Sequence, residues 1–170
     1  EIAVRREDRS AADPDEIGDV WVKSPTLFNG YCRNETATDE ALDGPWLLTG
    51  DMGAMDQDGF LSIMDRRKDM VISGGINIYP REIEEVLLRH DSVAEAAVVG
   101  VPDEKWGECL AAVIVPRPGK TATPDEIIAY CRQHLGGYKV PRNITFAHEL
   151  LRNPAGKVMK RTIREQLSNV

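Results

Sequence analysis

The sequence predicts an α+β protein in which a small antiparallel β unit is followed by a compact α+β domain. Residues 1–64 contain short stretches of alternating polar and apolar residues cut by turn residues, which is typical of half-buried strands. Residues 65–170 instead alternate apolar runs with amphipathic helical segments. Five consecutive charged residues, 65–69, separate these two sequence patterns, so we place the domain boundary at 64/65.

Three segments of the first unit alternate in polarity and are predicted strands: 19–24, 45–49 and 59–64. The turn-forming run Asp56-Gln57-Asp58-Gly59 separates the last two and predicts a hairpin. A short helix is expected over 37–42, with Thr36 or Thr38 as its N-terminal cap. Together these elements predict an antiparallel sheet, which could close into a distorted barrel.

A hairpin and a helix begin the second unit. Strands are expected at 70–72 and 76–78, joined by Ser73-Gly74-Gly75. Pro80 then starts a helix at the position where its missing N–H costs nothing. Ile83, Val86 and Leu87 line one face of that helix.

The centre of the second unit is predicted to be a buried sheet. Two near-continuous apolar runs, 93–101 and 109–115, favour strands that are covered on both faces. A last strand is expected over 142–147 and a last helix over 160–167. About one hundred residues in this domain suffice for a core of its own.

A second amphipathic helix in this unit begins with a capping box, Thr123-Pro124-Asp125-Glu126. The pair Gly136-Gly137 is expected to end the helix. Its predicted buried residues are Ile127, Ile128, Cys131 and Leu135.

Charge and hydropathy exclude several classes of partner. A net charge of −7 argues against nucleic acid binding, and no apolar run approaches the ~20 residues that a transmembrane helix needs. The last twenty residues nevertheless lean basic, which we interpret as a local site for one polyanionic small molecule. The cations concerned are Arg152, Lys157, Lys160, Arg161 and Arg164.

Cysteine and histidine usage predicts no metal site. The three cysteines are odd in number, match no ligand spacing, and place Cys109 and Cys131 in apolar stretches. Cys109 and Cys131 are expected to be buried thiols in a reducing compartment, which favours the cytoplasm. The three histidines are scattered and have no second ligand type nearby.

Several short segments, taken in order, resemble motifs of the adenylate-forming superfamily of acyl-CoA synthetases, luciferases and peptide-synthetase adenylation domains. They are Trp46-Leu47-Leu48-Thr49-Gly50-Asp51, residues 65–69 with 73–75 and 79–84, residues 101–108, Tyr138-Lys139-Val140-Pro141 and Asn153-Pro154-Ala155-Gly156-Lys157. Each is weak alone, but together they cover most of the chain. Within the superfamily the sequences of these motifs are most similar to those of fatty-acyl and related acyl-CoA ligases.

The resemblance implies a C-terminal portion of an ATP-dependent ligase, with residues 1–64 as the end of a larger N-terminal domain and residues 65–170 as a mobile lid. Such enzymes convert a carboxylic acid and ATP into an acyl-adenylate, and CoA then displaces AMP. The implied partners are therefore the acid, ATP, CoA and the missing N-terminal part, whose absence would leave this chain alone inactive. Mg²⁺ is implied by the family, but no ligand for it is identified here.

The resemblance also assigns roles in nucleotide chemistry. Asp51 is expected to accept hydrogen bonds from the ribose hydroxyls, although it could simply cap a turn. Arg66 is matched to a nucleotide-contacting arginine. Lys157 is matched to the mobile catalytic lysine, which stabilises charge that develops during adenylation. The alternative is an exposed turn with a solvated lysine.

Further matches concern the hinge and CoA. Lys68 lies at the position of the family hinge and is expected to act through its backbone. Gly74 and Gly75 are expected to line the channel for the pantetheine arm, although they could serve only as a hairpin turn. The expected contacts of the CoA nucleotide, with surface packing as the alternative, are Trp106, Tyr138 and Arg142.

Two other functions stay open. One is a peptide-synthetase adenylation domain that loads a carrier protein, and the other is a non-catalytic docking module. The sequence does not indicate which acid is activated, nor the oligomeric state.

Overall fold

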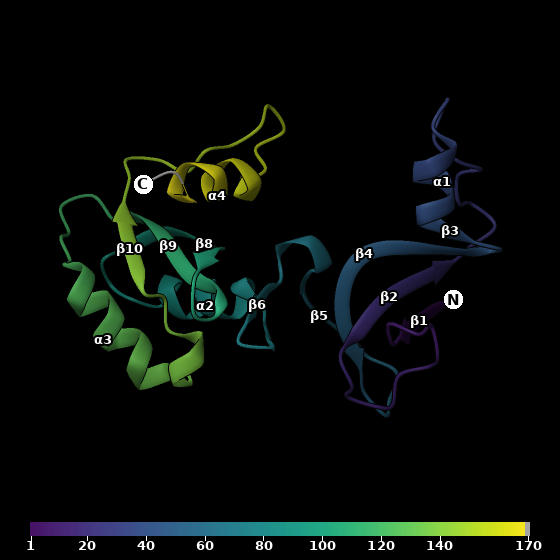
Figure 1. Ribbon diagram of the computed structural model, residues 1–170, viewed down its shortest axis with the longest axis horizontal. Coiled ribbons are helices and arrows are strands. Elements are labelled where there is room, and N and C mark those ends of the chain that lie inside the picture. The colour runs from purple at the N-terminus through teal and green to yellow at the C-terminus, as the bar shows by residue number, and fades with distance from the viewer. Residues whose placement is uncertain (169–170) are drawn as a thin grey trace. The chain divides into compact units, whose positions relative to one another are not determined.

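The computed structural model describes residues 1–168 and contains two compact units, Glu1–Lys68 and the chain from Asp69 onward, each with its own sheet (Figure 1). The division at 68/69 lies later than the junction predicted at 64/65. The reason is that strand β5 (Leu61–Arg66) includes the first two residues of the charged run, with Asp65 still paired to Met52.

The first unit is a five-stranded antiparallel sheet. Its strands are β1 (Ile2–Arg5), β2 (Gly18–Lys23), β3 (Leu42–Asp43), β4 (Trp46–Met55) and β5. The order is β1-β2-β4-β3, with β5 also on β4, so this sheet is open and the predicted barrel closure is wrong for the described residues. The long strand β4 is curved (Figure 1), which lets it pair with β3 at its start and with β5 at its end.

The turn between β4 and β5 confirms the predicted hairpin. Asp56 Oδ1 accepts the N–H groups of Asp58 (3.0 Å) and Phe60 (2.8 Å). Gly59 adopts the left-handed conformation, with φ of +86°. The aspartate and glycine therefore have the turn roles that their residue types predict.

The short helix of this unit, α1 (Glu35–Ala41), begins earlier than predicted. Its cap is Asn34, whose Oδ1 accepts the N–H of Ala37 at 3.0 Å. The predicted caps Thr36 and Thr38 are wrong. The Thr38 hydroxyl instead donates to the carbonyl of Asn34 and accepts from the N–H of Tyr31.

The second unit is a sheet with helices on both faces. Its strands are β6 (Val71–Ser73), β7 (Ile76–Ile78), β8 (Val93–Asp103), β9 (Gly107–Pro116) and β10 (Asn143–Phe146). Its helices are α2 (Pro80–Leu88), α3 (Pro124–His134) and α4 (Lys160–Ser168), with 3-10 turns η1 (Arg67–Asp69) at the junction and η2 (Gly137–Lys139) after α3. β10 runs parallel to β9, and the other pairings are antiparallel.

The two faces of β9 enter two separate cores, as the unbroken apolar runs predicted. Leu110, Ala112 and Ile114 pack with α2 and α3, whereas Ala111 and Val113 pack with Ile163 of α4. Alternate side chains of a strand point to opposite faces, so a central strand covered on both sides must be apolar throughout.

Helix α3 confirms the capping box and ends immediately before the predicted glycine pair, but without the expected glycine cap. Thr123 and Glu126 exchange side-chain-to-backbone hydrogen bonds at the start of the helix. Ile127 and Cys131 are buried, whereas Ile128 and Leu135 are only partly so. The helix ends on Leu135 in an extended conformation, and Gly136 has a φ of −59°, so the expected glycine cap is absent. Leu135 packs against the core, which turns the chain away from the helix axis.

The helices that the structure describes in residues 1–168 are all too short or too polar to cross a membrane.

Candidate nucleotide and coenzyme sites

Asp51 and Arg66 are brought together by strand register. They lie opposite each other on β4 and β5 and form an ion pair in which Arg66 Nε is 2.9 Å from Asp51 Oδ1. The backbone at Gly50 has a φ of +76°, and the Thr49 hydroxyl accepts the N–H of Asp51 and donates to the carbonyl of Val20. The Asp51 carboxylate is therefore held in a fixed backbone position, is partly exposed, and lies beside the Arg66 guanidinium. The carboxylate can accept hydrogen bonds from hydroxyl groups, and the guanidinium can bind a neighbouring phosphate.

Arg67 is an anchor that the sequence analysis missed. It pairs with Asp19, a carboxylate that is 5% exposed, and with Glu7. The hydrogen bond with Asp19 raises the pKa of Arg67, so the guanidinium stays charged at any physiological pH. Lys68 comes next; it is exposed and is the last residue of the first unit. In the sequence, nothing distinguishes Arg67 from the other charged residues of 65–69, so its ion pairs could not be predicted.

The Gly74-Gly75 turn connects β6 and β7, and both glycines are left-handed, with φ of +58° and +81°. A Cβ atom on Gly74 would lie 2.7 Å from Cε3 of Trp106, whereas one on Gly75 would meet nothing within 4 Å. The N–H of Gly74 also donates to the carbonyl of Trp106 at 2.9 Å. Gly74 is therefore required by packing, and Gly75 leaves open space above the turn.

Asp103 joins Trp106 to Arg142. Its Oδ1 accepts the N–H of Trp106 (2.9 Å) and of Lys105 (3.0 Å), while its Oδ2 pairs with Arg142 at 3.2 Å. The hydrogen bond from the Trp106 backbone lowers the pKa of Asp103, which keeps its carboxylate charged. The Arg142 guanidinium consequently lies 5.9 Å from the centroid of a Trp106 ring, as a cation beside a partly exposed indole.

Tyr138 is not joined to this cluster. It lies in η2, is 53% exposed, and its ring is 5.6 Å from the ammonium group of Lys139. In the described part of the chain, no ring contact or hydrogen bond links it to Trp106 or Arg142. The predicted CoA residues therefore divide into a Gly74–Trp106–Arg142 cluster, the open position at Gly75 and a separate tyrosine.

Lys157 lies in a tight hydrogen-bonded loop and is exposed. Its backbone N–H donates to Asn153 Oδ1, and its carbonyl accepts the N–H of Asn153, both at 2.9 Å. Gly156 donates to the carbonyl of Asn153 at 2.8 Å and has a φ of +79°. The loop thus fixes the backbone of Lys157 and leaves its side chain in solvent.

The basic residues around Lys157 are already paired, which corrects the interpretation of this region as a polyanion site. Their partners are Glu95 for Arg152, Glu84 for Lys160, Glu165 for Arg161 and Glu108 for Arg164. Lys157 alone among these five cations pairs with no carboxylate of residues 1–168. The exposed ammonium group of Lys157 is therefore the one cation of this cluster that is available to a ligand without first leaving a carboxylate.

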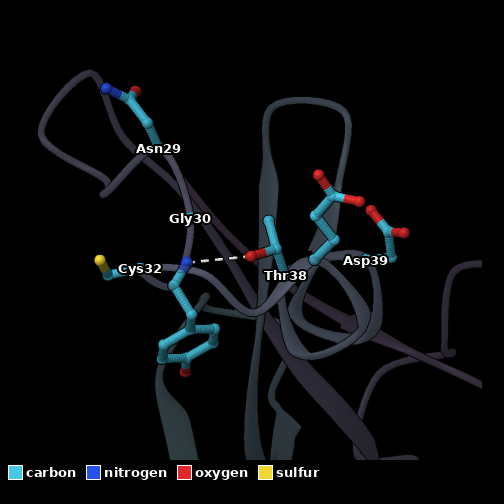
Figure 2. A pocket seen from close by; sticks show the side chains of 7 residues that line it. Asn29, Gly30, Cys32, Thr38 and Asp39 are labelled. Carbon is cyan, nitrogen blue, oxygen red and sulfur yellow. Dashed lines mark hydrogen bonds between the residues drawn. The ribbon is translucent and has the colours of Figure 1, made fainter.

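A pocket of about 400 Å³ lies in the first unit and is lined by none of these residues (Figure 2). It is formed by the loop that crosses α1, where Tyr31 donates its N–H to the Thr38 hydroxyl at 2.9 Å. Its lining is Asn29, Gly30, Tyr31, Cys32, Glu35, Thr38 and Asp39. No predicted site residue belongs to it.

No group of three or more His, Cys, Asp or Glu side chains that could together hold a metal ion is found in residues 1–168.

Comparisons with known proteins show which family the chain resembles. Residues 82–157 match the family described as the AMP-binding enzyme C-terminal domain. The chain is 42% identical over 98% of its length to a long-chain-fatty-acid–CoA ligase of Yersinia pestis. The chain spans about a third of the length of the relatives it matches, and 29% of the length of the Yersinia pestis ligase.

Two solved structures have a similar fold. The o-succinylbenzoate CoA synthetase of Bacillus subtilis, in complex with an acyl-adenylate intermediate, gives a TM-score of 0.91 at 39% identity, over 96% of this chain and 33% of that one. The amide bond synthetase McbA of Marinactinospora thermotolerans gives 0.92 at 39% identity, over 98% and 34%. The similarity to CoA ligases does not favour the peptide-synthetase alternative.

Proposed function

The chain belongs to the adenylate-forming enzymes, and we propose that it is the C-terminal part of an ATP-dependent ligase that joins a carboxylic acid to CoA. In the first half-reaction a carboxylate oxygen attacks the α-phosphorus of ATP, and the bond to pyrophosphate breaks. In the second the CoA sulfur attacks the acyl carbon, AMP leaves, and the thiol proton passes to solvent. The acid we propose is a fatty acid, and the compartment is the cytoplasm.

The unpaired ammonium group of Lys157 is the observation that carries this proposal. Negative charge grows on the α-phosphate and the attacking carboxylate during adenylation, and an ammonium group brought beside them stabilises both. Neighbouring cations are neutralised by glutamates, so they compete little for the substrate. Lys157 acts in the first half-reaction and is not needed in the second.

Asp51 and Arg66 hold the nucleotide in this proposal. The carboxylate of Asp51 accepts hydrogen bonds from the ribose hydroxyls, and each of its oxygens has two lone pairs, so the bond from Arg66 leaves acceptor capacity. Arg66 neutralises Asp51 and offers its remaining N–H groups to the nucleotide.

The second half-reaction uses the other residues. The open space over Gly75 admits the pantetheine arm, while Trp106 and Arg142 contact the nucleotide of CoA through the indole face and the guanidinium. Tyr138 extends this surface. Lys68, at the junction of the two units, is the hinge between the two half-reactions.

The test is the Lys157→Ala variant of the full-length enzyme. Adenylation, followed by ATP–pyrophosphate exchange, should fall by a factor of ~10²–10³. Conversion of preformed acyl-adenylate and CoA to the thioester should be unchanged. Lys120→Ala, which removes another exposed lysine from a turn, is the matched control. An equal loss in both half-reactions would remove Lys157 from the adenylation step.

A further inference from the structure

Asn153 holds Lys157 from both sides of its backbone. The N–H of Asn153 donates to the carbonyl of Lys157, and its Oδ1 accepts the N–H of Lys157, each at 2.9 Å. The same Oδ1 accepts the N–H of Ala155 at 3.1 Å, and the Asn153 carbonyl accepts the N–H of Gly156 at 2.8 Å. A single residue therefore organises the loop from 153 to 157, through two hydrogen bonds to its side chain and two of its backbone.

The rest of the loop removes its remaining freedom. Pro154 fixes its own φ, and Gly156 supplies the left-handed conformation that closes the turn. Arg152 donates to the carbonyl of Gly156 at 2.8 Å and pairs with Glu95 of β8, which ties the loop to the sheet. The backbone beneath Lys157 is thus held by bonds that do not involve its ammonium group.

The start of α4 is fixed just beyond the loop. Lys160 Nζ lies 2.7 Å from Glu84 Oε1, which also accepts the N–H of Val98 in the edge strand β8. Both charged side chains are more than four-fifths buried. This pair holds the C-terminal end of the loop in place while Asn153 holds its interior.

We propose that Asn153 is a positioning residue that sets the location of the Lys157 ammonium group for adenylation; this inference rests on the proposed function of Lys157. Electrostatic stabilisation depends on a charge being in place before the reaction, and a displacement of about 1 Å can cost ~100-fold in rate. Asn153 is uncharged and acts only through the backbone of the loop.

The experiment compares Asn153→Ala and Asn153→Ser in the full-length enzyme. For Asn153→Ala the kcat of adenylation should fall by about 10- to 100-fold, with little change in the KM for ATP. Serine should restore part of the loss, because its hydroxyl can accept a backbone N–H two residues along the chain. Gln133→Ala, which removes an exposed amide from α3, should behave as wild type. A shift in KM alone, or no benefit from serine over alanine, would overturn the inference.

A double variant separates positioning from general stability. If Asn153 acts through Lys157, then Asn153→Ala should cost no additional activity in a Lys157→Ala background. Thioester formation from preformed acyl-adenylate should be unaffected. Additive losses, or equal losses in both half-reactions, would overturn the inference. Normal adenylation by Asn153→Ala, together with a crippled Lys157→Ala, would overturn it and leave the proposed function intact. Normal adenylation by Lys157→Ala would defeat both.

Discussion

Arg66 lies directly opposite Asp51 in the register of β4 and β5, and its Nε forms an ion pair with the Asp51 carboxylate at 2.9 Å. The two residues belong to separate sequence motifs, and the pairing of β4 with β5 brings them into contact. An acidic residue alone would repel the phosphates of ATP, whereas the pair presents an acceptor for the ribose beside a donor for the phosphate.

The pair can be tested through the ribose itself. Asp51→Ala in the full-length enzyme should raise the KM for ATP on the order of 10- to 100-fold, because hydrogen bonds to a charged group are worth ~1.5–3 kcal/mol. The variant should also lose the preference of the wild type for ATP over 2′-deoxyATP, measured by pyrophosphate exchange. Asp58→Ala, in the exposed turn that follows β4, is the control. Unaltered discrimination in Asp51→Ala would assign Asp51 to the turn alone.

Gly75→Leu should separate the half-reactions in the opposite direction from Lys157→Ala. The leucine would occupy the open space over the turn, so thioester formation should fail while pyrophosphate exchange stays near wild type. A left-handed leucine costs about 1–3 kcal/mol, so thermal stability must be measured in parallel. Gly75→Asn, which tolerates this conformation, should retain most of the thioester activity. Loss of both activities in both variants would mean that the turn is merely structural.

The sequence predicted those features that depend on periodicity and local chemistry. The two-sided core around β9, the capping box at Thr123 and the glycine hairpin at 74–75 follow from patterns of a few neighbouring residues. β1 was missed because this short strand is defined by its pairing with β2, more than ten residues further along the chain. β3 pairs locally with the start of β4 and was missed because Leu42 was assigned to the preceding helix. The position of the end of α3, just before Gly136-Gly137, was predicted correctly, but the predicted glycine cap was wrong, because the chain leaves the helix at an extended Leu135 that packs against the core.

The candidate site was predictable only in part for the same reason. Lys157 could be matched to a motif, but the fact that it alone is unpaired depends on the fold. Three neighbouring cations find glutamates elsewhere in the fold, and only Arg161 has a local partner, in its own helix. Asn153 carried a usable signal, since Asn at the first position, Pro at the second and Gly at the fourth are the preferences of a type I turn. Arg67 carried no such signal, because its partner Asp19 is far away in sequence.

The cysteines of the isolated chain should differ sharply in reactivity. Cys32 is exposed, whereas burial raises the pKa of Cys131 to about 11 and also raises that of Cys109. At pH 8 roughly one Cys131 thiol in a thousand would be the reactive thiolate even if reagent reached it. A chromogenic disulfide reagent should therefore titrate one thiol rapidly and the other two only after denaturation. Cys32→Ser should abolish the rapid phase, and a second fast thiol in native protein would contradict the packing of the two cores.

Lys68→Pro tests whether the junction between the two units is the hinge. Lys68 follows Arg67, which is tied to Asp19, so torsional change is expected just beyond this anchor. Proline fixes φ near −65° and removes an N–H, which should hold the full-length enzyme in the orientation that tolerates this φ. Because only a conformational step is altered, one half-reaction should survive, and we expect it to be adenylation.

Lys68→Ala is the comparison for that experiment, because it deletes the exposed ammonium group and leaves the backbone free. Both half-reaction rates of each variant would be measured, with thermal unfolding to confirm that the units are intact. Similar behaviour of the proline and alanine variants would show that Lys68 acts through its charge. Two normal half-reactions in the proline variant would move the pivot to another residue of the charged run, and Asp69, the first residue of the second unit, would be substituted next.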